Sequence, residues 1–273
     1  MRRFPRYALA GLVVALLAGA GGARGQDVEA PAFPGARTAA ARVPAGPPAN
    51  VLRALFGGRT TYTDQANCPR GCAVKLLATE VWAKEDGTPM MLLVSAAEPK
   101  DAAHATGAPL GMALLQRDGN RWQVAAGSPA VDVQGAWGEP PSVGVVLAGD
   151  FGRGVVATPE ISSQGVALTS WHLYLPLASG SGQRFVKVLQ LETAQDSYAA
   201  CEKDDSGCRR RADVQDFSST VMTEPAPDGG LNVVQAVTPA TAAGTPAELR
   251  RWHIAINGTV TQTAGRQPHR RDR

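Results

Sequence analysis

The chain has 273 residues, enough for one large domain or two small ones once segments that do not fold are set aside. The formal net charge is +3, but residues 1–25 hold four arginines and no acidic residue, and the tail from Ala264 contributes +3. The body, residues 26–263, therefore has a net charge of about −4. It lacks the excess of basic residues that is typical of a nucleic-acid-binding protein.

Residues 1–25 predict a secretory signal peptide. The first six residues contain three arginines and precede an uncharged apolar run, residues 8–20. Ala23-Arg24-Gly25, after this run, fits a cleavage signal. The run is shorter than the roughly 20 residues of a membrane-spanning helix, which favours a cleaved leader over an uncleaved anchor. We therefore predict a periplasmic or secreted protein with no transmembrane segment after cleavage.

Residues 26–49 are rich in Ala and Pro and predict a disordered linker. Asn50 is placed to cap a short helix over residues 51–56, which Gly57-Gly58 would end. Residues 50–263 are predicted to form a single β-rich domain. Residues 264–273 predict a basic, disordered tail.

Four cysteines occur as two close pairs, Cys68 with Cys72 and Cys201 with Cys208. In an oxidising compartment such thiols pair, and four cysteines allow three connectivities. We predict the two local bridges, because short loops close readily, and we expect them to staple irregular loops. A zinc site is the alternative, but the spacing within each pair is wrong and no histidine lies close to either.

Alternating apolar residues and turn dipeptides predict strands along most of the body. Eleven strands are predicted: 74–84, 90–96, 110–116, 121–125, 142–148, 154–158, 166–175, 184–193, 217–223, 231–236 and 249–257. Long amphipathic helices do not alternate with them, which argues against a parallel α/β sheet. The predicted fold class is all-β: antiparallel sheets in a sandwich, or an open barrel-like or propeller-like arrangement of short strands, with a short N-terminal helix.

Two strands show which face is buried. In residues 171–175 Trp171 and its odd-numbered neighbours are apolar, while His172 and Tyr174 point the other way. Residues 252–256 repeat the layout, with Ile256 on the inward face and His253 on the opposite one.

No catalytic motif stands out. Of the four histidines, His269 falls in the tail, and neither a Gly-x-Ser-x-Gly elbow nor a His-Glu-x-x-His motif accompanies the other three. The glycines of residues 149–154 have the wrong spacing for a nucleotide loop and predict a turn. The acidic loop at Asp204-Asp205 lacks calcium-site spacing, so we predict neither a metal nor a cofactor.

One segment is distinctive. It contains a turn opening at His104, a hairpin ending in Trp122, and the loop Gly135-Ala136-Trp137-Gly138-Glu139-Pro140. This layout resembles a family of uncharacterised exported bacterial β-rich proteins with a Gly-x-Trp-Gly-x-Pro loop, over roughly residues 76–191. Thr106 stands where the resemblance implies a cysteine, so any extra bridge of that family is absent. The family brings no assigned activity.

Trp137 has two interpretations. The glycines around it let the backbone approach closely, so the ring plugs one end of the β core; this is the interpretation we favour. Alternatively the ring is exposed as a recognition anchor. His104 would line the same end in either case, so Trp137 and His104 are the candidate binding residues.

Three functions fit these observations. The leading one is a noncatalytic exported protein that binds a partner protein or an envelope component through loops at one end of the β core. The alternatives are an extracytoplasmic hydrolase built from scattered residues such as His104, His172 or His253, and a structural module of an envelope assembly. The absence of a catalytic signature favours a protein that is not an enzyme.

Overall fold

The computed structural model describes residues 61–64, 68–100, 102–104, 106–119, 121–179, 182–197, 201, 207–208, 216–240 and 248–265. All of them belong to one unit of the chain, residues 33–273. The predicted leader, linker and first helix lie outside the described residues, as does the tail beyond Gly265.

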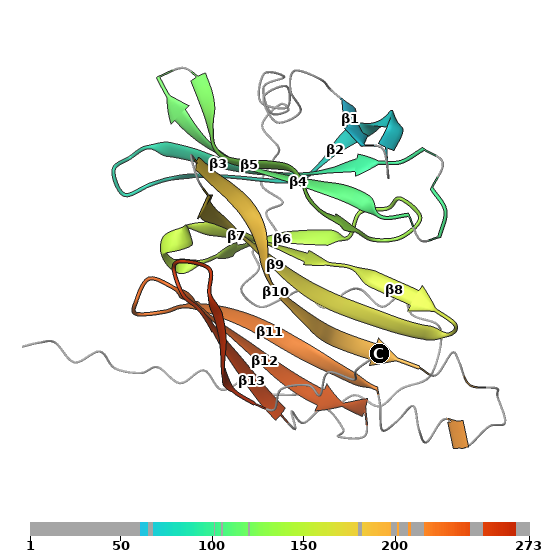
Figure 1. The fold of residues 1–273 in the computed structure, drawn as a ribbon. Coiled ribbons are helices and arrows are strands. Elements are labelled where there is room, and N and C mark those ends of the chain that lie inside the picture. The colour runs from blue at the N-terminus through green and yellow to red at the C-terminus, as the bar shows by residue number, and fades with distance from the viewer. Residues whose placement is uncertain are drawn as a thin grey trace, which may run out of the picture. The chain divides into compact units, whose positions relative to one another are not determined.

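The described residues form an all-β structure, as the sequence predicts. Fourteen strands belong to one branched sheet that is not closed into a barrel (Figure 1). Each of the eleven predicted strands overlaps an observed strand. Three short strands were missed: β1 (Thr61–Asp64), β8 (Glu160–Ser163) and β14 (Val260–Ala264).

The first layer is an antiparallel meander of consecutive strands. After β1 it contains β2 (Cys68–Ala83), β3 (Pro89–Glu98), β4 (Ala108–Asp118) and β5 (Arg121–Gln134). β5 is much longer than predicted, and its additional residues lead directly into the Trp137 loop.

The central layer follows in the chain. Its strands are β6 (Ser142–Leu147), β7 (Arg153–Thr158), β9 (Val166–Ser179) and β10 (Gly182–Asp196), with β8 pairing the start of β9. The predicted turn between β6 and β7 is a 3₁₀ turn, η1 (Gly149–Phe151).

The third layer is a second antiparallel meander. It contains β11 (Phe217–Pro225), β12 (Leu231–Pro239), β13 (Glu248–Ile254) and β14. β13 ends at Ile254, before a turn in which the Gly258 N–H donates to the Ala255 carbonyl. Ile256 therefore lies in that turn and is 58% exposed, which corrects the prediction that it faces the core.

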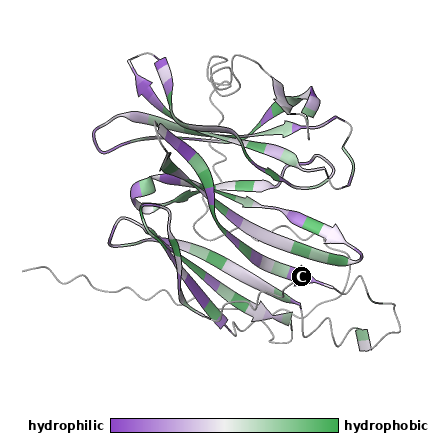
Figure 2. Ribbon diagram, in the orientation of Figure 1, coloured by the Kyte–Doolittle hydropathy of each residue, from purple (hydrophilic) through white to green (hydrophobic). Residues whose placement is uncertain are grey.

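The central layer has a core on each of its faces. One core joins β3, β4 and β5 to the central strands, and the other joins the central strands to β11, β12 and β13. Leu173 of β9 packs in the second core, whereas the adjacent Tyr174 packs in the first, and both are fully buried. Figure 2 shows the alternation of apolar and polar residues along several strands from which these faces arise.

His172 and Tyr174 do point away from Trp171, as predicted, but the face they occupy is covered as well. His172 is only 3% exposed. A pattern within one strand cannot show this, because the covering layer comes from β3, β4 and β5, which lie far earlier in the chain.

β10 is the junction of the three layers. It pairs with β9 along its whole length, with β5 through a single parallel pair at Gln183 and Ala126, and with β11 at Ala194 and Gln195. The first layer therefore departs from one end of β10, and the third layer departs from the other. β5–β10 is the one parallel pairing among the described strands, so the sheet is mixed.

Both predicted local disulfides are present, Cys68–Cys72 and Cys201–Cys208. Cys68 and Cys72 lie within β2, opposite β1, rather than in the irregular loop that we predicted. A register shift loops out the residues between them, and Gly71 there has a φ of 81°. Cys68 and Cys72 form a small buried cluster with Ala97, and the partly buried Tyr62 packs against it.

We expect the Cys68→Ala/Cys72→Ala double variant to lose about 2 kcal/mol of the free energy of unfolding, since a short closed loop removes little chain entropy. Urea denaturation followed by far-ultraviolet circular dichroism measures this. The Cys201→Ala/Cys208→Ala pair should show a loss of similar size. A midpoint unchanged from that of the oxidised wild type would contradict the prediction.

Candidate functional site

Trp137 lies in the loop that connects β5 to β6, and its side chain is 59% exposed. The favoured sequence interpretation, a ring that plugs the end of the core, is therefore wrong. Neither core cluster contains Trp137, because the loop turns away from the sheet immediately after Gln134.

Three positive φ values within four residues turn the ring outward. Trp137 has a φ of 55°, and Gly135 and Gly138 have φ values of 85° and 74°. A Cβ atom on Gly135 would overlap the Glu139 carbonyl oxygen, because Ala136 and Glu139 form a bridge across the turn. The two glycines are thus required by close approach as well as by conformation.

The loop rests on the segment between β3 and β4. The Trp137 N–H donates to the His104 carbonyl at 3.3 Å, and the Gly138 N–H donates to the Thr106 carbonyl at 2.7 Å. The Thr106 hydroxyl in turn accepts from the Ala103 N–H at 3.0 Å. The two loops therefore support each other through main-chain bonds.

The two predicted binding residues meet in this arrangement. The His104 ring contacts the Trp137 ring edge-on, with 5.1 Å between centroids and perpendicular planes. Such T-shaped pairs are favourable because the positive edge of one ring meets the negative face of the other. The contact holds one side of the indole and leaves most of the ring open to solvent.

This display of a tryptophan has a free-energy cost. A left-handed conformation costs a non-glycine residue about 1–2 kcal/mol, and an exposed ring forgoes about 25 cal/mol for each Å² of apolar surface left in water. Strained, exposed residues held by their surroundings concentrate at functional sites. Trp137 is therefore the strongest candidate for a binding residue in the described part of the chain.

A polar network lies just before the loop. Asp132 Oδ2 accepts hydrogen bonds from Tyr174 Oη at 2.9 Å and Gln134 Nε2 at 2.6 Å, and it pairs with Lys187 Nζ at 2.8 Å. Asp132 and Gln134 belong to β5, whereas Tyr174 and Lys187 are paired neighbours on β9 and β10. The network thus joins the first layer to the central layer where β5 separates from β10.

The environment sets the protonation of this network. Burial opposes ionisation of Asp132, but the bonds from Lys187, Gln134 and Tyr174 outweigh it, and the pKa of Asp132 is lowered. Burial and the Asp132 charge raise the pKa of Tyr174. The network therefore contains an ionised carboxylate and a neutral phenol at neutral pH.

His172 lies next to the network and makes only one long contact with it. Its Nδ1 lies 3.5 Å from Tyr174 Oη, and its Nε2 is buried with no hydrogen-bond partner among the described residues. Burial and the nearby Lys187 charge lower the pKa of His172 from 6.5 to about 4. A neutral, enclosed imidazole of this kind has no access to a substrate.

His253 is the third predicted histidine, and it lies on β13 in the third layer. Its Nε2 is 3.0 Å from Asp228 Oδ2, and its Nδ1 is 3.0 Å from Asn232 Oδ1. A catalytic histidine presents one nitrogen to a carboxylate and the other to a nucleophile or water. Here a carboxamide occupies that second position. The three candidate histidines lie on separate elements: His104 between β3 and β4, His172 on β9 and His253 on β13.

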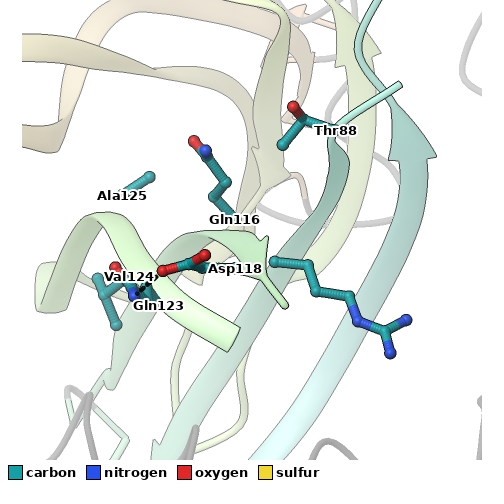
Figure 3. A pocket seen from close by; sticks show the side chains of 7 residues that line it. Thr88, Gln116, Asp118, Gln123, Val124 and Ala125 are labelled. Atoms are coloured by element: carbon teal, nitrogen blue, oxygen red, sulfur yellow. Dashed lines mark hydrogen bonds between the residues drawn. The ribbon is translucent and has the colours of Figure 1, made fainter. Parts of the chain in front are cut away.

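A polar pocket lies at the opposite end of the β4–β5 pair from the Trp137 loop. Its volume is about 410 Å³, and its lining includes Thr88, Gln116, Asp118 and Gln123 (Figure 3). Gln123 Nε2 donates to Asp118 Oδ2 at 2.8 Å across it. The lining offers hydrogen bonds, but it has no histidine or second carboxylate to work with Asp118 as an acid–base pair.

Within the described residues, no group of three or more His, Cys, Asp or Glu side chains is placed to hold a metal ion. In the same part of the chain, no helix is long and apolar enough to cross a membrane. No protein-family model, curated protein or solved structure matches this chain.

Sequence reasoning located Trp137 and His104 but missed the network beside them. It ended the strand at Ala125, although Val131-Asp132-Val133-Gln134 continues the alternation that marks one. That pattern could have placed Asp132 and Gln134 on one face of β5. Nothing local to the sequence indicates that Tyr174 and Lys187 lie opposite them.

Proposed function

We propose that this protein is a noncatalytic, exported recognition protein that binds a partner protein or envelope component through the Trp137 loop. The observation that carries the proposal is an exposed tryptophan held in a left-handed conformation by two main-chain hydrogen bonds and an edge-on histidine. A rigid aromatic anchor loses little conformational entropy on binding, and tryptophan is enriched among residues that dominate interface energies.

The surroundings of the histidines argue against the hydrolase. His172 is enclosed, and both nitrogens of His253 already face side-chain oxygens. His104 contacts an indole ring rather than a carboxylate. Two disulfides suit a protein outside the cytoplasm, and we include export and the kinship suggested by the Gly-x-Trp-Gly-x-Pro loop in the proposal.

We expect Trp137→Ala to abolish retention of the partner in affinity capture from envelope extracts. Truncation of a hot-spot residue costs about 2 kcal/mol or more, so partner recovery should fall at least about tenfold, while the exposed ring contributes little to folding. Thermal unfolding of the variant should match that of the wild type.

Leu249→Ala is the matched control, because Leu249 is also a large exposed apolar residue, 51% exposed, but lies on β13. Recovery should be unchanged in this variant. If Trp137→Ala retains the same proteins in the same amounts as wild type, the recognition role of the loop is refuted.

Gly135→Ala tests the geometry of the loop with the indole still present. The added methyl group overlaps the Glu139 carbonyl and forces the turn to change, so recovery of the partner should fall as it does for Trp137→Ala. Full recovery would mean that the left-handed turn is irrelevant to binding.

A further inference from the structure

Glu139 is the second exposed side chain of the turn that displays Trp137. Its N–H donates to the Ala136 carbonyl at 2.9 Å and closes the turn, while its side chain is exposed. Within the described residues its carboxylate has no ion-pair partner. The Cα atoms of Trp137 and Glu139 lie within about 7 Å of each other, because two residues span no more. One short turn therefore displays an exposed indole and an exposed carboxylate.

These two groups favour the same kind of ligand, a cation. The face of an indole has a negative electrostatic potential, and tryptophan attracts ammonium and guanidinium groups more strongly than the other aromatic side chains do. A carboxylate attracts the same groups and accepts their N–H bonds, and such charge-assisted bonds are stronger than neutral ones. An anionic ligand would be repelled by the ring face and by the carboxylate.

The type of cation follows from what surrounds the ring. Sites for quaternary ammonium groups enclose them in a cage of aromatic rings. Among the described residues the one ring in contact with Trp137 is His104, which lies edge-on at 5.1 Å between centroids. The site is thus open, and its carboxylate is matched by a cation that has N–H donors. Lysine and arginine side chains have these donors, whereas a quaternary ammonium group has none.

Lys100 is the other charged side chain described in the two loops, and it is exposed on the segment that carries His104. It forms no ion pair with Glu139, so it does not neutralise that carboxylate by contact. Its charge opposes a cationic ligand. The sign of the site can therefore be tested by removing the two charges one at a time.

We propose that the Trp137 turn binds a lysine or arginine side chain from a basic segment of the partner protein. The cation lies against the indole face, and its N–H groups donate to the Glu139 carboxylate. This names the chemistry of the partner in the proposed function, on which it rests, and it selects a basic protein over an anionic envelope component.

The test is an NMR titration of the full chain, as recovered after export, with ¹⁵N-labelled indoles. The chain has five tryptophans, and the Trp137 resonance is the one missing from Trp137→Phe. A blocked hexalysine peptide should shift that resonance in a saturable way, and added salt should weaken the binding because the site is exposed. A blocked hexaglutamate peptide at the same concentration should leave the resonance in place.

Charge variants locate the contact. Glu139→Gln should weaken hexalysine binding roughly threefold, as expected for the loss of one exposed ion pair, and Glu139→Lys should abolish the saturable shift. The matched control is Glu85→Gln, because Glu85 is also exposed but lies in the turn between β2 and β3, at the opposite end of β3 from His104. This control should bind like the wild type, and Lys100→Gln should bind at least as tightly.

An unchanged Trp137 resonance with hexalysine, or equal affinities of the wild type and Glu139→Gln, overturns the inference. Loss of hexalysine binding in Lys100→Gln would also overturn it, since removing a positive charge cannot weaken a cation site. A saturable shift with neutral chitotriose and none with hexalysine would assign the surface to a saccharide instead.

Affinity capture separates this result from the proposed function. If capture depends on Trp137 but Glu139→Lys recovers the partner like the wild type, the proposed function stands and the basic ligand is overturned. If hexalysine binding depends on Glu139 but capture does not depend on Trp137, the cation site stands and the proposed function fails.

Discussion

Replacing Asp132 by alanine is expected to lower the free energy of unfolding by about 2–3 kcal/mol. The substitution removes the common acceptor of three groups, Tyr174, Gln134 and Lys187. The Tyr174 hydroxyl then stays in a fully buried side chain without its acceptor, and an unsatisfied buried hydroxyl costs about 1–3 kcal/mol. Loss of the partly exposed Lys187 pair adds less, because water screens it.

The cause of that loss can be isolated with Tyr174→Phe. By itself this variant should lose about 1 kcal/mol, the net value of one hydrogen bond. In the Asp132→Ala background the same change removes the orphaned hydroxyl, so it should be neutral or stabilising in urea denaturation. Additive losses in the double variant would show that the two side chains act independently, contrary to their 2.9 Å contact.

The second large effect is a loss of stability in mild acid. The pKa of His172 is about 4 in the folded protein, against an ordinary value of 6.5. The unfolded chain therefore binds a proton that the folded chain does not, and stability falls as pH drops below 6.5. The loss reaches about 2 kcal/mol at pH 5 and about 3 kcal/mol at pH 4.

His172→Gln tests this assignment, since a carboxamide does not titrate. Urea denaturation at pH 7 and pH 5 should show a wild-type loss that is about 2 kcal/mol larger than the variant's. The other histidines and the carboxylates contribute equally to both proteins, so the difference reports His172 alone. Equal losses in the two proteins would mean that His172 is protonated in the fold as easily as in water.

The Asp132 network supports the Trp137 loop as well as the stability of the fold. Asp132 and Gln134 lie at the end of β5, and the Trp137 loop begins immediately after them at Gly135. The junction of β5 with β10 is held by few main-chain bonds, and side chains complete it. The Trp137 loop thus departs from a point that the network fixes to the central layer.

The sequence by itself determined the all-β class, the approximate positions of eleven of the fourteen described strands, the local disulfides and the two residues that meet at the loop. Each of these depends on neighbours within a few residues: alternation, turn dipeptides, and cysteines close enough to pair. His104 and Trp137 were singled out by the glycines and prolines around them. A local signal was enough because the required backbone conformation is itself local.

Only the tertiary structure decided that the ring is exposed, that both faces of β9 are buried, and that Asp132 serves Tyr174 and Lys187. Whether a side chain is covered depends on which distant strands pack over it. The residue pattern of a single strand does not show which strands these are. His172 shows the consequence. The same alternation that directs it away from Trp171 would leave it exposed in a two-layer sandwich, but a third layer covers it here.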